Sequence, residues 1–259
     1  MKHICVIGND RRMEYIAEYF YNLGYEISKS LYEIKDNSIV ICKPVIDKTE
    51  EKDLCNKIKK TNYLFIGKVS QTFEGFLNKN KIMYYQYLKD KLVTTENAIL
   101  TAKGIIKEAS NYNSVIEESH CLVTGYGYCG KALAFELFKH NANVDVLVRN
   151  KELKNEIQKN NYGYYNFSDI NTMDLSKYSY VFNTVPAIVF TKNEIDKCSK
   201  NIMIYDIASG MGGVDANYCL SNNIFYHQSL GIPGKYYPGK AGEIIANAIN
   251  KIISTIIPL

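Results

Sequence analysis

Three glycines, spaced as Gly125-x-Gly127-x-x-Gly130, are the residues whose type and spacing indicate chemistry most directly. An apolar run precedes them, and a helix-compatible segment and a second apolar run follow. In that setting the first glycine permits a sharp turn, the second leaves room for a pyrophosphate, and the third lets the helix pack close to the strand. The N–H groups and dipole at the helix start attract the phosphates. The alternative is a tight turn without a ligand. The residues that we expect to contact a dinucleotide here are Gly125, Tyr126, Gly127, Tyr128, Cys129 and Gly130.

The end of the second apolar run distinguishes two forms of the cofactor. NAD-binding folds usually carry Asp or Glu there, which accepts a hydrogen bond from the ribose 2′-OH. Here the residues are Arg149, Asn150 and Lys151, with no acid among them. A guanidinium attracts a 2′-phosphate, which a carboxylate would repel. We therefore expect NADP, bound in part by these three residues. NAD stays the alternative, in which Arg149 is a solvated strand-end residue.

Three further segments, 183–186, 206–213 and 230–235, each combine an apolar strand end with turn residues. In an open α/β sheet, ligands bind beyond the carboxyl ends of the strands, so these loops are expected to flank the nicotinamide. Gly and Pro are also ordinary loop residues, and each segment is a plain connection if no ligand is bound. The cofactor contacts expected from them are Thr184, Val185, Pro186, Ala208 and Gly231.

The elements that must position these residues alternate along the whole chain. Short apolar runs at 4–8, 25–28, 38–42 and 63–67 are separated by helix-compatible segments. A helix over 94–110, capped by Thr94 or Thr95, is expected to bridge two domains. The pattern predicts the α/β class, with two Rossmann-like domains that have parallel sheets and are joined by long helices. We place the domains at 1–110 and 116–238. The wide apolar stripe of 239–257 must be buried, for example against the first domain.

Composition narrows the class of protein. The net charge of +4 over 259 residues is mild and its basic residues are scattered, so nucleic-acid binding is not expected. No apolar run is long enough to span a membrane. The seven cysteines are odd in number and form no C-x-x-C pair, which indicates a reducing cytoplasm with neither zinc nor disulfides. Cys129 is expected to be a small residue that fits the turn, the alternative being a thiol with a lowered pKa.

The combined pattern resembles the A subunit of dipicolinate synthase. Besides the glycine turn and 183–186, the matching segments are 8–11, 94–99, 206–215 and 231–242; the chain departs from the family at Val93, Asn97 and Met211. The resemblance implies a two-domain oxidoreductase that acts with the separate B subunit of dipicolinate synthase. The pair would oxidise dihydrodipicolinate to dipicolinate, using NAD(P), in the cytoplasm of the mother cell of a sporulating bacterium.

A substrate with two carboxylates calls for cations and hydrogen-bond donors around it. Arg11 can bind a carboxylate in bidentate fashion, and Lys235 can supply a second cation. Asp206 is the first choice of proton acceptor. With Lys235 it makes up the expected catalytic pair. The residues expected to bind substrate are Asp10, Arg11, Thr94, Thr95, Glu96 and Ser209.

Other interpretations stay open at this point. Asp10 and Glu96 are alternative proton acceptors, and Asp10 can instead form a structural salt bridge with Arg11. His227 is expected to be a satisfied strand histidine rather than a base. A shikimate-dehydrogenase-like NADP oxidoreductase is a second hypothesis, and a nucleotide-binding protein without catalytic activity of its own is a third. An assembly of identical copies is a further open alternative.

Overall fold

The structure, a computed structural model, describes residues 2–111 and 115–256. It divides into two compact units, Met1–Asn97 with Pro233–Leu259 (unit 1) and Ala98–Ile232 (unit 2). The chain passes from one unit to the other inside α4 (Lys91–Ser110) and returns inside α9 (Ile232–Tyr236). Our sequence-based divisions, near 110 and 238, fall after these helices rather than within them.

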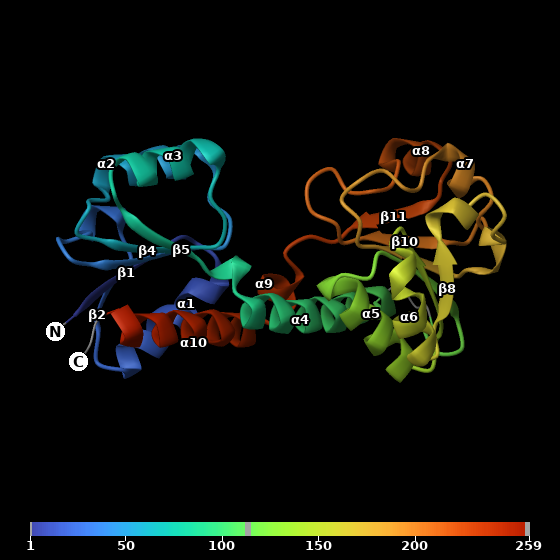
Figure 1. The fold of residues 1–259 in the computed structure, drawn as a ribbon, viewed down its shortest axis with the longest axis horizontal. Helices are drawn as coiled ribbons and strands as arrows, with labels where there is room; N and C mark the ends of the chain where they lie inside the picture. Colours follow the sequence, from blue (N-terminus) through green and yellow to red (C-terminus); the bar gives the residue numbers. More distant parts are fainter. Residues whose placement is uncertain (1, 112–114, 257–259) are drawn as a thin grey trace. The chain divides into compact units, whose positions relative to one another are not determined.

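Unit 1 is built on a five-stranded parallel sheet in the order β2-β1-β3-β4-β5. The strands are β1 (His3–Ile7), β2 (Glu26–Ser28), β3 (Ile39–Cys42), β4 (Tyr63–Ile66) and β5 (Met83–Gln86). The helices are α1 (Arg11–Asn22), α2 (Lys48–Lys57), α3 (Gln71–Lys79) and α10 (Pro238–Ile256) with the first part of α4. Figure 1 shows α2 and α3 on one face of this sheet and α1 and α10 on the other. The inner strands are apolar runs because both of their faces are covered.

Helix α10 packs along α1 within unit 1. Gly242 permits the close approach, because a side chain there would collide with the backbone of Arg12. The Tyr19 hydroxyl donates to Asn247 Oδ1 across the same pair of helices at 2.8 Å. Ile249 has no exposed surface. The apolar stripe of α10 is therefore covered as far as Ile253, over the backbone of Arg12, whereas Ile256 is exposed and residue 257 lies outside the described residues.

Unit 2 is built on a six-stranded parallel sheet in the order β11-β10-β9-β6-β7-β8. The strands are β6 (His120–Thr124), β7 (Asn143–Val148), β8 (Gly163–Asn166), β9 (Tyr180–Asn183), β10 (Met203–Asp206) and β11 (Phe225–Gln228). The helices are α5 (Tyr128–Lys139), α6 (Lys154–Lys159), α7 (Lys192–Ile195) and α8 (Ala216–Ser221) with the second part of α4. Counted from the first strand of the unit, the order is 6-5-4-1-2-3, the doubly wound order of dinucleotide-binding folds. The predicted class, α/β with two Rossmann-like parallel sheets, is confirmed.

Several elements differ from the sequence-based prediction. The prediction omitted β5 and β8, which are edge strands with half-buried tyrosines and no continuous apolar run. It also omitted α3 and treated 230–235 as a loop, whereas Ile232–Tyr236 form the short helix α9. Edge strands are covered less than inner strands, which weakens the apolar pattern that identifies them.

The start of α4 corrects a second prediction. The helix begins at Lys91, and Asp90 Oδ1 accepts from the backbone N–H of Leu92 at 2.9 Å and of Val93 at 3.1 Å. Thr94 and Thr95, which we expected to cap the helix, lie inside its first two turns. Aspartate caps as well as threonine does, and the capping residue lies four positions before Thr94 and five before Thr95.

Candidate functional site

The glycine turn of unit 2 joins β6 to α5. Gly125 has φ +86°, and a side chain on it would collide with Thr184 Oγ1. Gly130 lies so close to the Gly125 carbonyl oxygen that a side chain at 130 would overlap it. Two of the three glycines are therefore required by the turn itself, because one adopts a left-handed conformation and the other touches backbone.

Gly127 differs from the other two glycines. A Cβ atom on it would meet no atom within 4 Å, so its outer side is open. It is also the N-cap of α5, and no side chain accepts a hydrogen bond from the first turn of this helix. The first turn contains no acidic residue. These features together fit a pyrophosphate, which would accept from the N–H groups that the helix leaves without a capping side chain.

Tyr126, Tyr128 and Cys129 complete the turn. Tyr126 is buried and its hydroxyl accepts from Asn160 Nδ2 at 3.2 Å, whereas Tyr128 is half exposed. Burial raises the pKa of the Cys129 thiol. A raised pKa disfavours the thiolate, which favours the small residue that fits the turn over a thiol with a lowered pKa.

A buried polar network lies behind the turn, at the ends of three neighbouring strands. Thr124 Oγ1 donates to Asn183 Oδ1 at 2.5 Å, and Asn183 Nδ2 donates to Asp206 Oδ1 at 2.8 Å. Asp206 also accepts from the backbone N–H of Ala208 at 3.0 Å and of Gly213 at 2.7 Å. Neither Asn183 nor Asp206 has exposed surface.

This network corrects the role that we expected for Asp206. Both of its carboxylate oxygens accept hydrogen bonds, and the side chain is sealed from solvent and from any ligand. The carboxylate instead shapes the following loop, because a side chain on Gly212 would overlap its oxygen. Ser209 at the tip of that loop is exposed and Ala208 is buried. Asp206 is thus a structural residue of the candidate site and not its proton acceptor.

The other residues expected to contact the cofactor follow the ends of β9 and β11. Thr184 Oγ1 donates to the Thr124 carbonyl at 2.7 Å, and Val185 and Pro186 continue the same loop towards solvent. Gly231 has φ +67° and is exposed at the end of unit 2. The structure therefore brings 125–130 and 184–185 together, because Gly125 directly contacts Thr184.

The end of β7 carries the residues expected to distinguish NADP from NAD. Arg149 is exposed and forms no ion pair within the described residues. Asn166, which sequence reasoning missed, is buried and donates to the carbonyls of Val148 and Arg149, each at 3.0 Å. Asn150 caps the next turn by accepting from the N–H of Glu152. Asn166 thus fixes the backbone from which the exposed Arg149 side chain extends.

Glu108 of α4 is a second residue that the sequence did not single out. Its side chain is 4% exposed and lies 3.5 Å from His227 Nε2. Ser229 Oγ donates to its other oxygen at 2.6 Å. His227 therefore has a carboxylate partner, consistent with the satisfied histidine that we predicted. A lone glutamate on an apolar helix face gave no sequence signal that could have identified it.

In unit 1, the turn from β1 to α1 contains the expected substrate residues. Asp10 caps α1 and accepts from Arg12 Nε at 2.8 Å and from Arg12 Nη2 at 2.6 Å. The structural salt bridge that we considered is therefore made with Arg12, and not with Arg11. Arg11 is exposed, and Gly234 of α9 packs against the Arg12 guanidinium. These hydrogen bonds lower the pKa of Asp10.

The expected substrate residues of α4 and α9 are two threonines, Glu96 and Lys235. Thr94 Oγ1 donates to the carbonyl of Asp90 at 2.7 Å, and Thr95 Oγ1 donates to that of Lys91 at 2.8 Å. Both hydroxyls are engaged inside the helix and do not point to a ligand. Glu96 is half-buried, while Lys235 is exposed with its ammonium 4.9 Å from the Tyr236 ring centroid.

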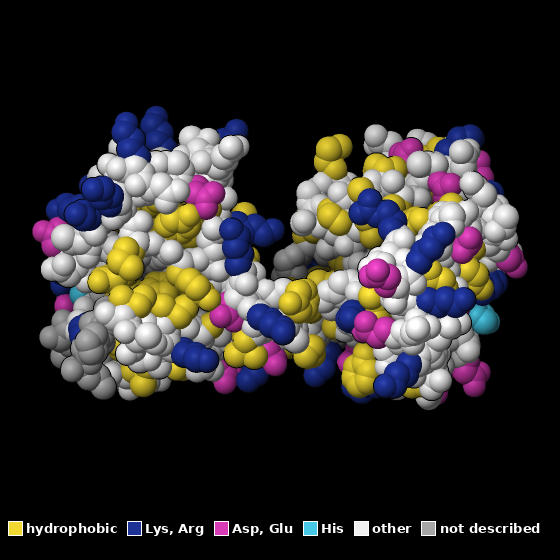
Figure 2. Space-filling model, viewed as in Figure 1, with side chains coloured by type: hydrophobic (Ala, Val, Ile, Leu, Met, Phe, Trp, Pro, Cys, Tyr) yellow, Lys and Arg dark blue, Asp and Glu magenta, His cyan; other side chains and the backbone are white. Residues whose placement is uncertain are grey.

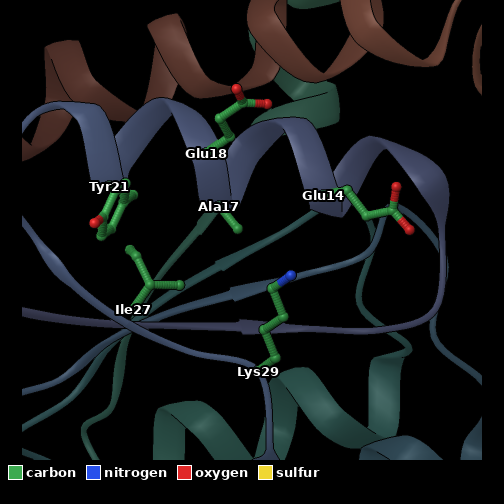
Figure 3. A pocket seen from close by; sticks show the side chains of 6 residues that line it. All are labelled: Glu14, Ala17, Glu18, Tyr21, Ile27 and Lys29. Carbon is green, nitrogen blue, oxygen red and sulfur yellow. The ribbon is translucent and has the colours of Figure 1, made fainter.

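A hollow of about 480 Å³ on unit 1 lies between α1 and β2 (Figure 3), and none of the residues named above lines it. Its lining includes two acids and one lysine, a charge balance that disfavours an anionic cofactor or a dicarboxylate. Its lining residues are Glu14, Ala17, Glu18, Tyr21, Ile27 and Lys29. Within 2–111 and 115–256, no three His, Cys, Asp or Glu side chains are grouped to hold a metal ion. No helix in the same ranges has the length and apolar character needed to cross a membrane.

Comparison with known proteins tests the resemblance. A scan against known protein families finds no match. The chain is 26% identical over 161 residues to the A subunit of dipicolinate synthase from Bacillus subtilis, which covers 62% of this chain and 54% of that protein. The crystal structure of the corresponding A subunit from Bacillus halodurans superposes with a TM-score of 0.86 at 20% identity, over 98% of both chains. This chain resembles the dipicolinate synthase A subunits.

Two further similarities broaden the comparison. Glutamyl-tRNA reductase of Clostridium botulinum is 27% identical over 219 residues, or 74% of this chain and 53% of that protein. The chain thus matches about half the length of these curated relatives. The NAD-complexed D-isomer specific 2-hydroxyacid dehydrogenase of Lactobacillus delbrueckii shares the fold, with a TM-score of 0.59 and 12% identity over 98% of this chain and 97% of that one. The architecture is therefore one on which dehydrogenases are built.

Proposed function

We propose that this protein is an oxidoreductase component that binds NADP in unit 2. The glycine turn carries the proposal: it follows β6, where the order of the doubly wound sheet changes direction, and Gly127 caps α5 without a side chain. Both features favour a pyrophosphate. When bound, the nicotinamide ring supplies the hydride acceptor. Arg149, on a backbone that Asn166 fixes, supports the choice of NADP over NAD.

We further propose, from the resemblance, that the substrate is dihydrodipicolinate and the product dipicolinate. The reaction removes a hydride and a proton and leaves an aromatic ring, so little acid–base assistance is needed. The residues of this chain mainly have to hold two carboxylates in place. Arg11 and Lys235 are the proposed cations. Arg12 contributes indirectly, by occupying Asp10.

The proton acceptor that we propose is Glu96, because the alternatives are engaged elsewhere. Asp206 is enclosed in its network and Asp10 is paired with Arg12. Glu96 is half-buried on α4 and forms no ion pair among the residues that the structure describes. The proposed partner is the B subunit of dipicolinate synthase, and the proposed compartment is the mother cell of a sporulating bacterium, both on the basis of the resemblance.

A reconstituted assay tests this function. The purified chain and the B subunit of a dipicolinate synthase are incubated with dihydrodipicolinate and either NADP or NAD, and the ultraviolet absorbance of the pyridine product is followed. We expect product with both proteins present, and faster with NADP. Calorimetric titration of the chain alone with NADPH measures binding separately. NADPH binding without product from the pair would favour a nucleotide-binding protein that has no catalytic activity.

A reductase that acts on glutamyl-tRNA is the second candidate. Its support is that similarity to glutamyl-tRNA reductase extends over more of this chain than does the similarity to the Bacillus subtilis protein. A net charge of +4 is small for a protein that binds a large polyanion, which ranks this candidate lower. Oxidation of NADPH that depends on glutamyl-tRNA, and not on dihydrodipicolinate, would reverse the order.

A further inference from the structure

A hollow between α2 and α3 of unit 1 has no place in the function proposed above. Its volume is about 470 Å³, within the usual range for sites that bind small molecules. None of its residues is among those expected to bind the cofactor or the dicarboxylate. The lining residues are Lys48, Glu51, Lys52, Cys55, Asn56, Ser70, Thr72, Phe73 and Phe76.

One wall of the hollow is aromatic. The rings of Phe73 and Phe76 are nearly parallel, at 12°, with their centroids 6.3 Å apart. Phe73 is buried, whereas Phe76 is half-buried and keeps part of its ring at the surface. Cys55 packs against the same apolar cluster from α2. A planar apolar group would therefore find a preformed surface of matching shape on this wall.

The rim of the hollow carries a net positive charge, because two lysines and one acid line it. Glu51 accepts from the Ser70 N–H at 3.0 Å and from Ser70 Oγ at 2.7 Å. Lys48 and Lys52 are exposed and form no ion pair within the described ranges. Figure 2 shows Lys and Arg side chains over the part of this unit that Figure 1 labels α2 and α3.

An adjoining hollow of about 360 Å³ extends the positive rim. It shares Lys48, Glu51 and Ser70 with the first and adds Lys68, which is also exposed. Its remaining acid, Asp47, accepts from two backbone N–H groups at the start of α2. The carboxylates around both hollows are thus held by the protein, and the ammonium groups stay available to a ligand.

We propose that the hollow between α2 and α3 binds a small molecule that combines a planar apolar ring with an anionic group. The ring lies against Phe76 and Cys55, and the anion is held by Lys48 and Lys52. The sequence did not indicate this site, because its two lysines and its Phe pair are typical of an ordinary helix surface. The proposal is independent of the cofactor in unit 2.

The experiment uses anilinonaphthalene sulfonate, a fluorescent aromatic anion, as the probe. The full chain is titrated with it in the presence of saturating NADPH, which keeps the probe from the glycine turn. We expect one site whose affinity falls at least about tenfold in Phe76→Ala and in the double variant Lys48→Gln/Lys52→Gln. Lys79→Gln is the matched control, since Lys79 is an exposed lysine of α3 outside the hollow, and it should bind as the wild type does.

Cys55 provides a second measurement that is specific to the site. Five of the seven cysteines are buried, and only Cys55 and Cys129 are partly accessible. The probe should slow alkylation of Cys55, followed by mass spectrometry at alkaline pH, and leave the rate at Cys129 unchanged. Equal affinity in all four proteins, or an unprotected Cys55, would overturn the proposal. If Phe76→Ala does not fold, the surface lysine variant and the labelling of Cys55 still decide whether the hollow binds the probe.

Discussion

The starts of α1 and α5 are two versions of one turn, in which a parallel strand runs into a helix. At α5 the N-cap is Gly127, and no side chain accepts from the first turn. At α1 the N-cap is Asp10, whose carboxylate accepts from the Arg12 N–H and also from its guanidinium. The start of α5 leaves its partial positive charge for a ligand, and the start of α1 neutralises it with a residue of its own.

The two N-caps distinguish the proposed phosphate site of unit 2 from the corresponding turn of unit 1. Both turns contain a glycine with positive φ after the strand, Gly8 at +120° and Gly125 at +86°. If the proposed function holds, that glycine alone does not make a nucleotide site. The deciding position is the N-cap, where an aspartate in unit 1 occupies the place that an anion would take.

The substitution Gly127→Asp would make the start of α5 resemble that of α1, and it should have the largest effect. A Cβ atom at position 127 meets no atom within 4 Å and the position is an N-cap, where Asp is favoured, so the fold should be kept. A carboxylate about 4 Å from a phosphate costs about 4 kcal/mol at an effective dielectric constant of 20. We expect NADPH affinity to fall roughly 100- to 1000-fold by calorimetric titration.

Gly127→Asn is the matched control for that change, because it adds the same volume without the charge. It should lose much less affinity than Gly127→Asp at unchanged melting temperature. If both variants bind NADPH as the wild type does, the pyrophosphate does not lie at this turn.

Arg149→Gln sharpens the comparison at the other end of the cofactor. A charge-assisted hydrogen bond contributes about 1.5–3 kcal/mol, so NADP should bind roughly 10- to 150-fold more weakly while NAD is nearly unaffected. The measurement is the ratio of the two dissociation constants. Lys159→Gln, at an exposed lysine of the same unit, should leave this ratio unchanged. An equal loss for both cofactors would contradict a contact with the 2′-phosphate.

Substitutions at Asp10 test the occupied turn. Asp10→Ala removes the cap and the partner of Arg12, and should lower the free energy of unfolding by about 1–2 kcal/mol in urea titrations. Asp10→Asn keeps the cap and should lose less. Asp53→Asn, at an exposed carboxylate of α2, is a control that should change little. If Asp10→Ala is as stable as the wild type, the turn is not held by this carboxylate.

The effect of Asp10 should also depend on pH. The hydrogen bonds from Arg12 lower the pKa of Asp10 in the folded state. The stabilisation is therefore complete above the unfolded value of about 4, and it is lost as the pH falls through the lower folded pKa. The difference in stability between the wild type and Asp10→Asn should shrink below about pH 4. A difference that stays constant there would show that the ion pair does not stabilise the fold.

The sequence predicted most of what depends on backbone and apolar pattern. The spacing of Gly125, Gly127 and Gly130 between two apolar runs identified the β6–α5 turn, and the sheet order that it requires is the one observed. The edge strands β5 and β8 were missed because their half-buried tyrosines give no apolar run. Local pattern thus identifies the inner strands of a sheet better than its edges.

Side-chain partners were harder to predict, because they depend on which acceptor is nearest in space. Asp206 at a strand end suggested a proton acceptor, but Asn183 and the N–H of Gly213, seven residues further on, enclose it. Asp10 pairs with Arg12 rather than Arg11, because the helical turn of α1 directs Arg12 towards Asp10 and Arg11 towards solvent. Such choices follow from helix phase and tertiary packing, which residue types alone do not determine.

Arg11→Gln should have the smallest effect on stability and is the sharpest test of unit 1. Arg11 is exposed and forms no ion pair in the part of the chain that the structure describes, so the free energy of unfolding should change by less than about 0.5 kcal/mol. If Arg11 binds a substrate carboxylate, KM for dihydrodipicolinate should rise about tenfold or more while NADPH affinity is unchanged. Arg12→Gln is the contrasting variant: it should cost stability because Asp10 loses its partner. If KM rises only in Arg12→Gln, the substrate contact belongs to Arg12, the less exposed of the two arginines. The start of α1 would then be capped by Asp10 and would also bind a ligand.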